Sequence, residues 1–216
     1  MAGPDFIFII VILIMSVVIH ELAHGYSALW LGDSTAKYAG RLTLNPIKHL
    51  DPVGSVLVPL LLYILPGNLI FGWAKPVPYN PYNLRNQKWG EAIVAAAGPL
   101  TNILIAVIFG LIVRLNVVFG VFPPAFTDLA SIVVFMNIIL AIFNLVPIPP
   151  LDGSKILFSV LPYHMQRFRL VLEQFGLILV IFFIFVLWRF IFPVVLWFFY
   201  LITGPAGIDG LMRFLG

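Results

Sequence analysis

The sequence SVVIHELAHGYSALW, residues 16–30, places two histidines and a glutamate at the end of a strongly apolar segment. The fourteen residues before His20, 6–19, contain only one polar side chain, that of Ser16. Such a segment has the character of a membrane-spanning helix. An unpaired carboxylate within a span costs about 2.5–3.5 kcal/mol on insertion scales, so the group His20, Glu21 and His24 indicates a functional site.

The composition places the whole chain in a bilayer. Of its 216 residues 62% are hydrophobic and 10% charged, whereas soluble domains are about half apolar and a quarter charged. We expect one domain, residues 1–216, of about four to six spans with short loops. The net charge of +3 is small, so lipid is the expected surrounding and nucleic acid is not an expected partner. Because the chain has no cysteine, any metal must be held by His, Asp or Glu.

Four segments are long and apolar enough to cross a hydrocarbon core about 30 Å thick. They are roughly residues 5–31, 91–113, 127–149 and 171–200. A fifth apolar run, 52–66, is short for a span and has Pro59 at its middle, which predicts a re-entrant or broken segment. The last span contains Pro193 and is expected to end or kink there. The predicted fold is therefore an all-α polytopic membrane protein.

The basic residues predict how the spans are oriented. Nine of the twelve Lys and Arg lie in three loops: Lys37, Arg41 and Lys48; Lys75, Arg85 and Lys88; and Lys155, Arg167 and Arg169. If 52–66 enters the membrane and returns, all three loops share one face, and the positive-inside rule makes that face cytoplasmic. The N-terminus would then be outside. We expect a multi-pass protein of a prokaryotic cell membrane with its site towards the cytoplasm.

The spacing of His20 and His24 is that of a zinc site on a helix. Four residues advance an α-helix by about 400°, so both imidazoles share a face and can bind one Zn²⁺ at about 2.0–2.1 Å. Glu21 beside them is then placed as the general base for a water molecule. The alternative is that the three side chains only join helices by hydrogen bonds, which does not require this spacing. His20 is fifteen positions after Asp5, so the site should lie about 22 Å along the span, within the membrane.

A catalytic zinc site needs three protein ligands and an open fourth position. No third histidine follows on the first helix, so the candidates are His49, Asp51, Asp152 and His164. Asp152 is favoured because three prolines, Pro147, Pro149 and Pro150, end the third span at the face where the first span also ends. The alternative is that Leu151-Asp152-Gly153 is only a helix-capping turn.

Five motifs, in their order, resemble those of the site-2 protease family of intramembrane zinc metalloproteases. They are HELAH (20–24), GRLTLNPIKHLDPVG (40–54), GWAKPVPYNP (72–81), AAGPLTN (96–102) and NLVPIPPLDG (144–153), and the resemblance covers about residues 16–157. It implies a core of transmembrane helices that carries zinc and cleaves the membrane-spanning segments of other proteins. His20, His24 and Asp152 would be the zinc ligands and Glu21 the catalytic base.

The resemblance also implies roles for two asparagines. Asn144, eight residues before Asp152, would contact the substrate backbone or the reacting carbonyl oxygen, and Asn102 is a further candidate for contact with the substrate. The stretch 67–126 has no room for a PDZ-type domain and nothing after residue 216 could be a CBS pair, so a minimal form is expected. Its partners would be transmembrane protein or peptide substrates, and its oligomeric state stays open.

A small β-hairpin is predicted near the site. A substrate helix must unwind before it is cut, and its backbone then needs new hydrogen-bond partners, which an exposed strand edge could supply. In residues 35–50, turn residues flank an alternating pattern around Leu42 and Leu44. The alternative for this stretch is an ordinary cytoplasmic loop.

Two other classes of function deserve comparison with a protease. A metal-ion transporter also buries His, Asp and Glu, but it needs a polar path to both faces. The outward half of this chain offers little for such a path besides Asn116, Asp128, Ser131 and Arg189. A silent membrane-protein binder needs no catalytic group, whereas every role that zinc proteolysis requires has a candidate residue here.

Overall fold

The computed structural model describes residues 3–57 and 74–215. These residues form helices and loops, and none of them forms a β-strand. Four helical stretches are long and apolar enough to span a membrane: Ile7–Trp30, Gly90–Phe119, Pro124–Asn144 and Gln166–Thr203. The four predicted spans are thereby confirmed, and the chain is an integral membrane protein.

The re-entrant segment predicted at 52–66 lies mostly outside the described residues. Only its first turn, the π-helix η2 (Pro52–Leu57), belongs to them.

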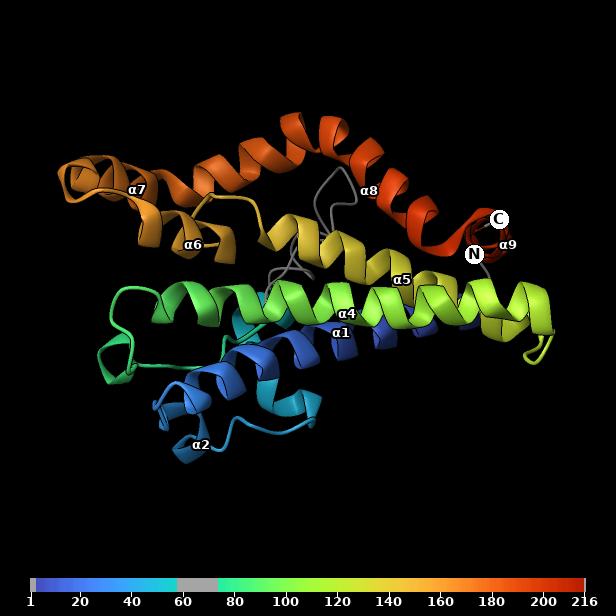
Figure 1. Ribbon diagram of the computed structural model, residues 1–216, viewed down its shortest axis with the longest axis horizontal. Helices are drawn as coiled ribbons and strands as arrows, with labels where there is room; N and C mark the ends of the chain where they lie inside the picture. Colours follow the sequence, from blue (N-terminus) through green and yellow to red (C-terminus); the bar gives the residue numbers. More distant parts are fainter. Residues whose placement is uncertain (1–2, 58–73, 216) are drawn as a thin grey trace.

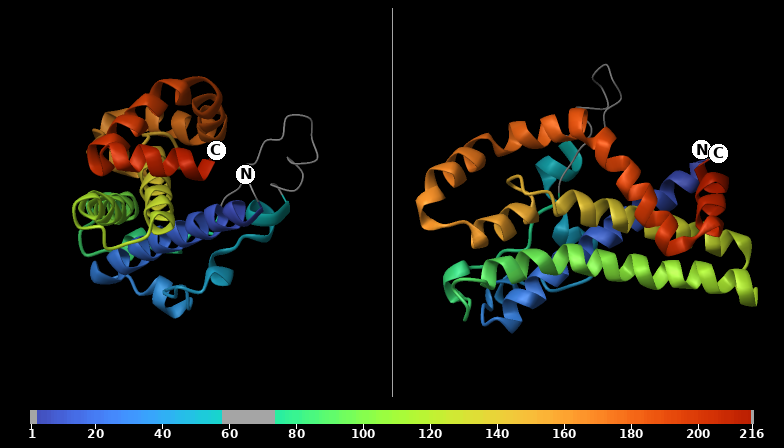
Figure 2. Two further views of the ribbon diagram at one scale, coloured as in Figure 1. Left: turned by 90° about the vertical axis from the view of Figure 1, so that its right-hand side faces the viewer. Right: turned by 45° about the horizontal axis from the view of Figure 1, so that its top comes forward.

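Three long helices, α1 (Gly3–Trp30), α4 (Gly90–Phe119) and α5 (Pro124–Asn144), form the centre of the molecule (Figures 1 and 2). Helix α4 packs against both α1 and α5. It begins at the end of the molecule where α1 finishes, and α5 runs back towards that end (Figure 1). Gly120 allows this return, because the residue that follows α4 has a φ of 60°, a conformation that glycine adopts without strain.

The C-terminal part forms a bent rod of helices that arches over α5 (Figure 1). Its elements are α7 (Gln166–Phe182), η5 (Phe183–Leu187) and α8 (Trp188–Thr203); α6 (Asp152–Val160) and η4 (Tyr163–Met165) precede it, and α9 (Pro205–Leu215) follows it. The rod bends at η5, a π-helical turn, which is a common cause of kinks. Pro193 lies inside α8 and does not end it. Phe199 and Val195 of α8, both fully buried, pack the rod onto the core.

The β-hairpin predicted at 35–50 is wrong. This stretch contains a helical turn, α2 (Thr35–Tyr38), and a 3-10 helix, η1 (Pro46–His49). Asn45 starts η1, because its side-chain oxygen accepts the backbone N–H of Ile47 at 3.1 Å, and a proline suits the position that follows. The asparagine and proline that suggested a hairpin turn therefore begin a helix.

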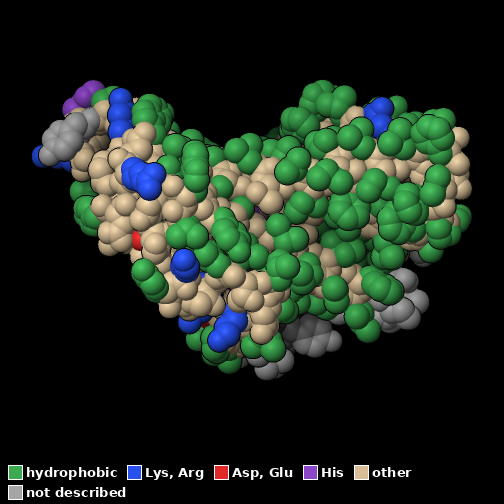
Figure 3. Space-filling model, turned by 60° about the horizontal axis from the view of Figure 1, so that its bottom comes forward, with side chains coloured by type: hydrophobic (Ala, Val, Ile, Leu, Met, Phe, Trp, Pro, Cys, Tyr) green, Lys and Arg blue, Asp and Glu red, His purple; other side chains and the backbone are tan. Residues whose placement is uncertain are grey.

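Most of the basic side chains in Figure 3 gather at one end of the molecule. This is the end at which α1 finishes, α4 begins and α7 begins (Figure 1), and it carries α2 and the loop 74–89. Hydrophobic side chains cover most of the rest of the face shown in Figure 3. The structure thus separates a polar end from a surface suited to lipid.

Candidate metal centre

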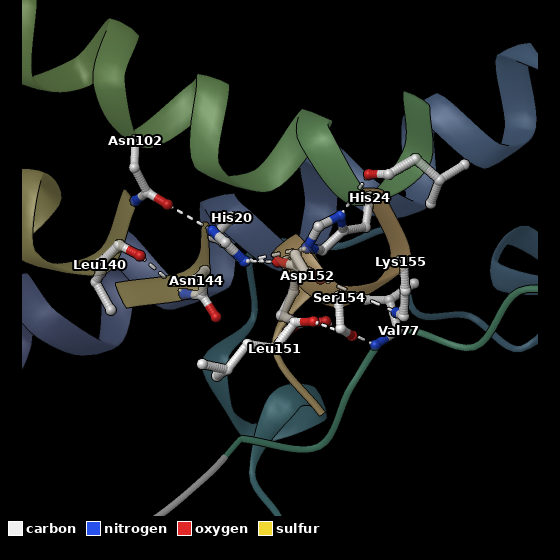
Figure 4. A network of polar contacts seen from close by, with 12 residues as sticks. His20, His24, Val77, Asn102, Leu140, Asn144, Leu151, Asp152, Ser154 and Lys155 are labelled. Atoms are coloured by element: carbon white, nitrogen blue, oxygen red, sulfur yellow. Dashed lines mark hydrogen bonds and ion pairs between the residues drawn. The ribbon is translucent and has the colours of Figure 1, made fainter. Parts of the chain in front are cut away.

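Helices α1 and α6 bring His20, His24 and Asp152 together inside the molecule (Figure 4). The two Nε2 atoms are 3.0 Å apart, and each lies 3.1 Å from Oδ2 of Asp152. All three residues are buried, with 5%, 9% and 8% of their surface exposed. Within residues 3–57 and 74–215 this is the group whose carboxylate and imidazole atoms lie close enough to share one metal ion.

The chain reaches Asp152 through a tight turn after α5. Helix α5 ends at Asn144, and the turn 145–151 leads directly into α6, whose first residue is Asp152. Gly153 permits this path, because a Cβ there would overlap the carbonyl oxygen of Leu145. The turn therefore sets the carboxylate of Asp152 opposite the histidine face of α1.

Each histidine is oriented by a hydrogen bond on its other ring nitrogen. His24 Nδ1 donates to the carbonyl oxygen of Val94 in α4 at 2.7 Å. His20 Nδ1 donates to Oδ1 of Asn102, also in α4. With Nδ1 protonated in both neutral rings, both Nε2 atoms present lone pairs to the cluster. Such an orienting bond is what metal-ligating histidines usually have.

The donor set fits a zinc ion. In the neutral tautomers described above, two imidazole lone pairs and a carboxylate oxygen lie 3.0–3.1 Å apart, and a cation among them would offset their mutual repulsion. Zinc bonds of about 2.0–2.1 Å in tetrahedral geometry separate ligand atoms by about 3.3 Å, close to these separations. Three protein ligands also leave a fourth position, as in catalytic sites.

Gly98 of α4 provides the space beside the two histidines. A Cβ at this position would lie 2.5 Å from His24 Nε2 and 2.6 Å from His20 Nε2. Any larger residue would occupy the volume towards which both nitrogens point. Sequence reasoning placed Gly98 in a family motif without a role, and it missed the carbonyl of Val94 altogether.

Glu21 lies next to the cluster on α1 but is directed to a different segment. Its Oε2 accepts the backbone N–H of Val77 at 2.7 Å. The loop that contains Val77 is held in turn by Arg41, whose Nη2 donates to the carbonyl oxygen of Lys75 at 2.7 Å. One carboxylate oxygen of Glu21 is therefore fixed by the backbone.

The two predicted asparagines differ in their surroundings. Asn102 has no exposed surface, and its Nδ2 donates to Oδ1 of Asn137 at 2.7 Å. Asn144 is partly exposed and ends α5, and its Nδ2 donates to the carbonyl oxygen of Leu140 at 3.0 Å. In Figure 4 Asn144 lies beside His20 and Asp152.

The other three candidates for the third ligand lie elsewhere. His49 is buried in η1 and its Nε2 donates to the carbonyl oxygen of Thr43 at 2.9 Å. Asp51 accepts the backbone N–H groups of the residues that begin η2. His164 is exposed in η4. None of the three belongs to the described cluster.

Comparison with known proteins finds a peptidase family and relatives that are named zinc metalloproteases. The model of peptidase family M50 matches residues 121–187. The chain is 38% identical over 176 residues to the "Putative zinc metalloprotease YwhC" of Bacillus subtilis, covering 79% of this chain and 77% of that protein. It is 31% identical over 199 residues to the "Putative zinc metalloprotease Rip2" of Mycolicibacterium smegmatis, covering 90% of this chain and 73% of that protein.

The chain belongs to peptidase family M50. This is the site-2 protease family, whose members are zinc-dependent metallopeptidases of membranes, so the resemblance seen in the sequence is confirmed. The family match contains Asn144 and Asp152, while the HELAH motif lies outside it. No solved structure matches the chain.

Proposed function

We propose that His20, His24 and Asp152 hold the zinc ion of an endopeptidase that cuts peptide bonds within or near transmembrane segments of other proteins. The observation that carries this proposal is the convergence of three potential ligand atoms, two imidazole nitrogens and a carboxylate oxygen, within 3.1 Å of one another inside a membrane-spanning bundle. Membership of family M50 supports it. A zinc ion bound there supplies Lewis-acid chemistry, which polarises a carbonyl group and makes a water molecule more acidic.

Glu21 is the general base of the proposed HExxH-type site. Its Oε2 is occupied by the N–H of Val77, so Oε1 is the oxygen that takes a proton from the attacking water. The same carboxyl then returns the proton to the amine that leaves. The bond from Val77 holds the carboxylate in one orientation, which reduces the entropy lost on reaching the reactive geometry.

Asn144 binds the substrate in this proposal. An amide nitrogen carries two hydrogens, so its bond to Leu140 leaves capacity to donate to a substrate carbonyl oxygen. A donor near a developing oxyanion contributes about 3–4 kcal/mol in other hydrolases. Asn102 is buried, with both ends of its amide bonded, so we assign it to the support of His20 in place of contact with the substrate.

The site opens towards the cytoplasmic side of a prokaryotic cell membrane in this proposal. His20 is ten residues from the end of its span, which is about 15 Å along a helix, and that end carries the basic loops. Residues 1–216 act as one catalytic domain on transmembrane protein or peptide substrates.

Replacing Glu21 by glutamine tests the proposal. The protein, purified and reconstituted in liposomes, is incubated with a panel of tagged single-span membrane proteins, and fragments are identified by mass spectrometry. Glu21→Gln should reduce cleavage by about 10²–10⁴-fold, because the proton acceptor is lost. Zinc content, measured by elemental analysis, should stay at one ion per chain because Glu21 is not a ligand.

Glu91→Gln is the matched control, since Glu91 is another carboxylate at the same end, in the first turn of α4. It should cleave like the wild type. Cleavage that persists undiminished in Glu21→Gln would contradict the proposed base. Cleavage and zinc content that are both unchanged in His20→Ala would contradict the proposed ligand set.

A further inference from the structure

A continuous line of buried polar side chains leads away from His20 through three helices. Asn102 of α4 accepts from His20 Nδ1, and its Nδ2 donates to Oδ1 of Asn137 in α5 at 2.7 Å. Asn137 Nδ2 donates both to Oγ of Ser16 in α1 at 2.9 Å and to the carbonyl oxygen of Val133 at 2.8 Å. Both asparagines have no exposed surface.

The far end of this line fixes the direction of every bond in it. The carbonyl oxygen of Val133 can only accept, so the atom of Asn137 that faces it must be the amide nitrogen. Oδ1 of Asn137 then faces Asn102 and can only accept, which turns the Nδ2 of Asn102 towards it. Oδ1 of Asn102 is left to face the His20 ring.

The consequence at His20 is a single neutral tautomer. Only a protonated Nδ1 can satisfy Oδ1 of Asn102, so in the neutral ring Nε2 carries the lone pair and points to His24 and Asp152. His24 reaches the same state by a shorter route, because its Nδ1 donates directly to a backbone carbonyl, that of Val94. Each histidine is thus tied to a main-chain acceptor, one directly and one through two amides.

We infer that Asn137 is a positioning residue for zinc binding, which acts through Asn102 to hold His20 in its metal-ligating tautomer. The inference rests on the proposed role of His20 as a ligand. Burial makes the line effective, because an amide turned by 180° would place two donors or two acceptors against each other where no water can bond to them. A purely structural role for Asn137 would join α5 to α4 and α1 without affecting the tautomer.

The tautomer can be read directly by nitrogen NMR. The chain has four histidines, so a sample with ¹⁵N-labelled histidine gives few signals, and His20→Gln assigns those of His20. In metal-free wild type at a pH where imidazole is neutral, His20 should show a protonated Nδ1 only. Asn137→Leu should give a mixture of both tautomers at His20, and leave His24 unchanged because its partner is Val94.

Zinc affinity gives a second readout. Asn137→Leu should weaken zinc binding by about 10–100-fold, as the loss of outer-shell partners does in other sites. The double variant with Asn102→Leu should be no weaker than Asn102→Leu alone, because Asn137 acts only through Asn102. Asn137→Ala, which removes the amide without adding volume, repeats the test if the leucine variant does not fold.

Ser131→Ala is the control, since Ser131 is a fully buried polar residue of α5 outside the line, with Oγ bonded to the carbonyl oxygen of Thr127. It should leave the tautomer and the affinity at their wild-type values. Ser16→Ala should do the same, because Val133 still orients Asn137. A single Nδ1-protonated tautomer and wild-type affinity in both Asn137 variants would overturn the inference while leaving the zinc site intact. Wild-type affinity in His20→Ala would instead count against the proposed function.

Discussion

In both halves of α4, residues four positions apart lie on one face of the helix, but the two halves contact different helices. In the first half, Val94, Gly98 and Asn102 face the histidines of α1, and they contribute a carbonyl oxygen, an open space and an amide. In the second half, Gly110 and Arg114 face the end of α8.

The second half of α4 has contacts of a structural kind. Gly110 lets α8 approach closely, since a Cβ there would overlap the side chain of Ile202. Arg114 Nε donates to the carbonyl oxygen of Ile202 at 2.7 Å. One face of α4 therefore contacts the two histidines of the candidate metal centre at one end and packs against α8 at the other, and a glycine makes room in both places.

The strongest test of this difference is alanine at the two glycines. Gly98→Ala should abolish zinc binding and cleavage, because the new Cβ lies 2.5–2.6 Å from both ligand nitrogens. Gly110→Ala should lower the free energy of unfolding by about 1–3 kcal/mol through its clash with α8, and so lower the melting temperature, while the protein keeps one zinc ion per chain. Zinc content by elemental analysis and unfolding followed by circular dichroism measure the two effects.

A Gly98→Ala protein that still binds one zinc ion per chain would contradict the idea that only the first half of α4 affects the metal centre. So would a Gly110→Ala protein that is folded but free of zinc.

Removal of the metal should affect the stability of the same two variants differently. A chelator removes the stabilisation that a bound ion gives, which is about 2.7 kcal/mol at a zinc concentration one hundred times the dissociation constant. The melting temperature of wild type and of Gly110→Ala should fall on chelation, whereas that of Gly98→Ala should not change. A chelator response in Gly98→Ala would place the stabilising ion at another site.

The loop that leads into the first half of α4 is held in place by a buried carboxylate, that of Asp33. Asp33 is fully buried, and it accepts the N–H of Asn80 at 2.8 Å and Nδ2 of Asn83 at 2.9 Å. Burial raises the pKa of the Asp33 carboxyl, but the hydrogen bonds from Thr35, Asn83 and Asn80 outweigh burial and lower the pKa below its ordinary value. The ionised carboxylate therefore stabilises the fold.

Asp33→Asn should cost about 1–2 kcal/mol at neutral pH. Because the folded pKa is depressed, the advantage of wild type over the variant should be present above the unfolded pKa of about 3.9, and be lost as pH falls through the folded pKa. Denaturant unfolding of both proteins across this range measures the difference. An advantage that stays constant to the lowest pH would contradict the role of the charge.

The smallest effect is expected at Arg114. Arg114→Met removes the hydrogen bonds to the carbonyl oxygens of Leu201 and Ile202, which lie near the end of α8. Because the guanidinium is exposed, we expect a loss of about 1 kcal/mol, with zinc content and cleavage unchanged. A loss of zinc in this variant would mean that the two halves of α4 are coupled.

The sequence predicted the spans and the main candidates of the site because both depend on local patterns. Continuous apolar runs specify helices that cross a membrane, and the spacing of His20 and His24 places them on one face. The prolines between Asn144 and Asp152 prevent α5 from continuing, so the chain turns there and places Asp152 opposite the two histidines. These inferences needed no knowledge of how helices pack.

The remaining parts of the site depend on packing between helices. Nothing local to Gly98 says that it faces two histidines, and the carbonyl of Val94 has no signature in a sequence. Asn137 lies seven residues before Asn144, and only its position against Asn102 makes it relevant. The hairpin failed for a local reason, since Asn45 was taken as a turn residue and instead starts a 3-10 helix.

The distance in sequence between the proposed ligands affects when the enzyme can first act. His20 and Asp152 are 132 positions apart, and the groups that orient the histidines lie on helices between them. A ribosome must therefore complete α1, α4, α5 and the start of α6 before a newly made chain has all three ligands. On the proposed ligand set, a complete zinc site therefore requires assembly of the bundle from helices made at different times.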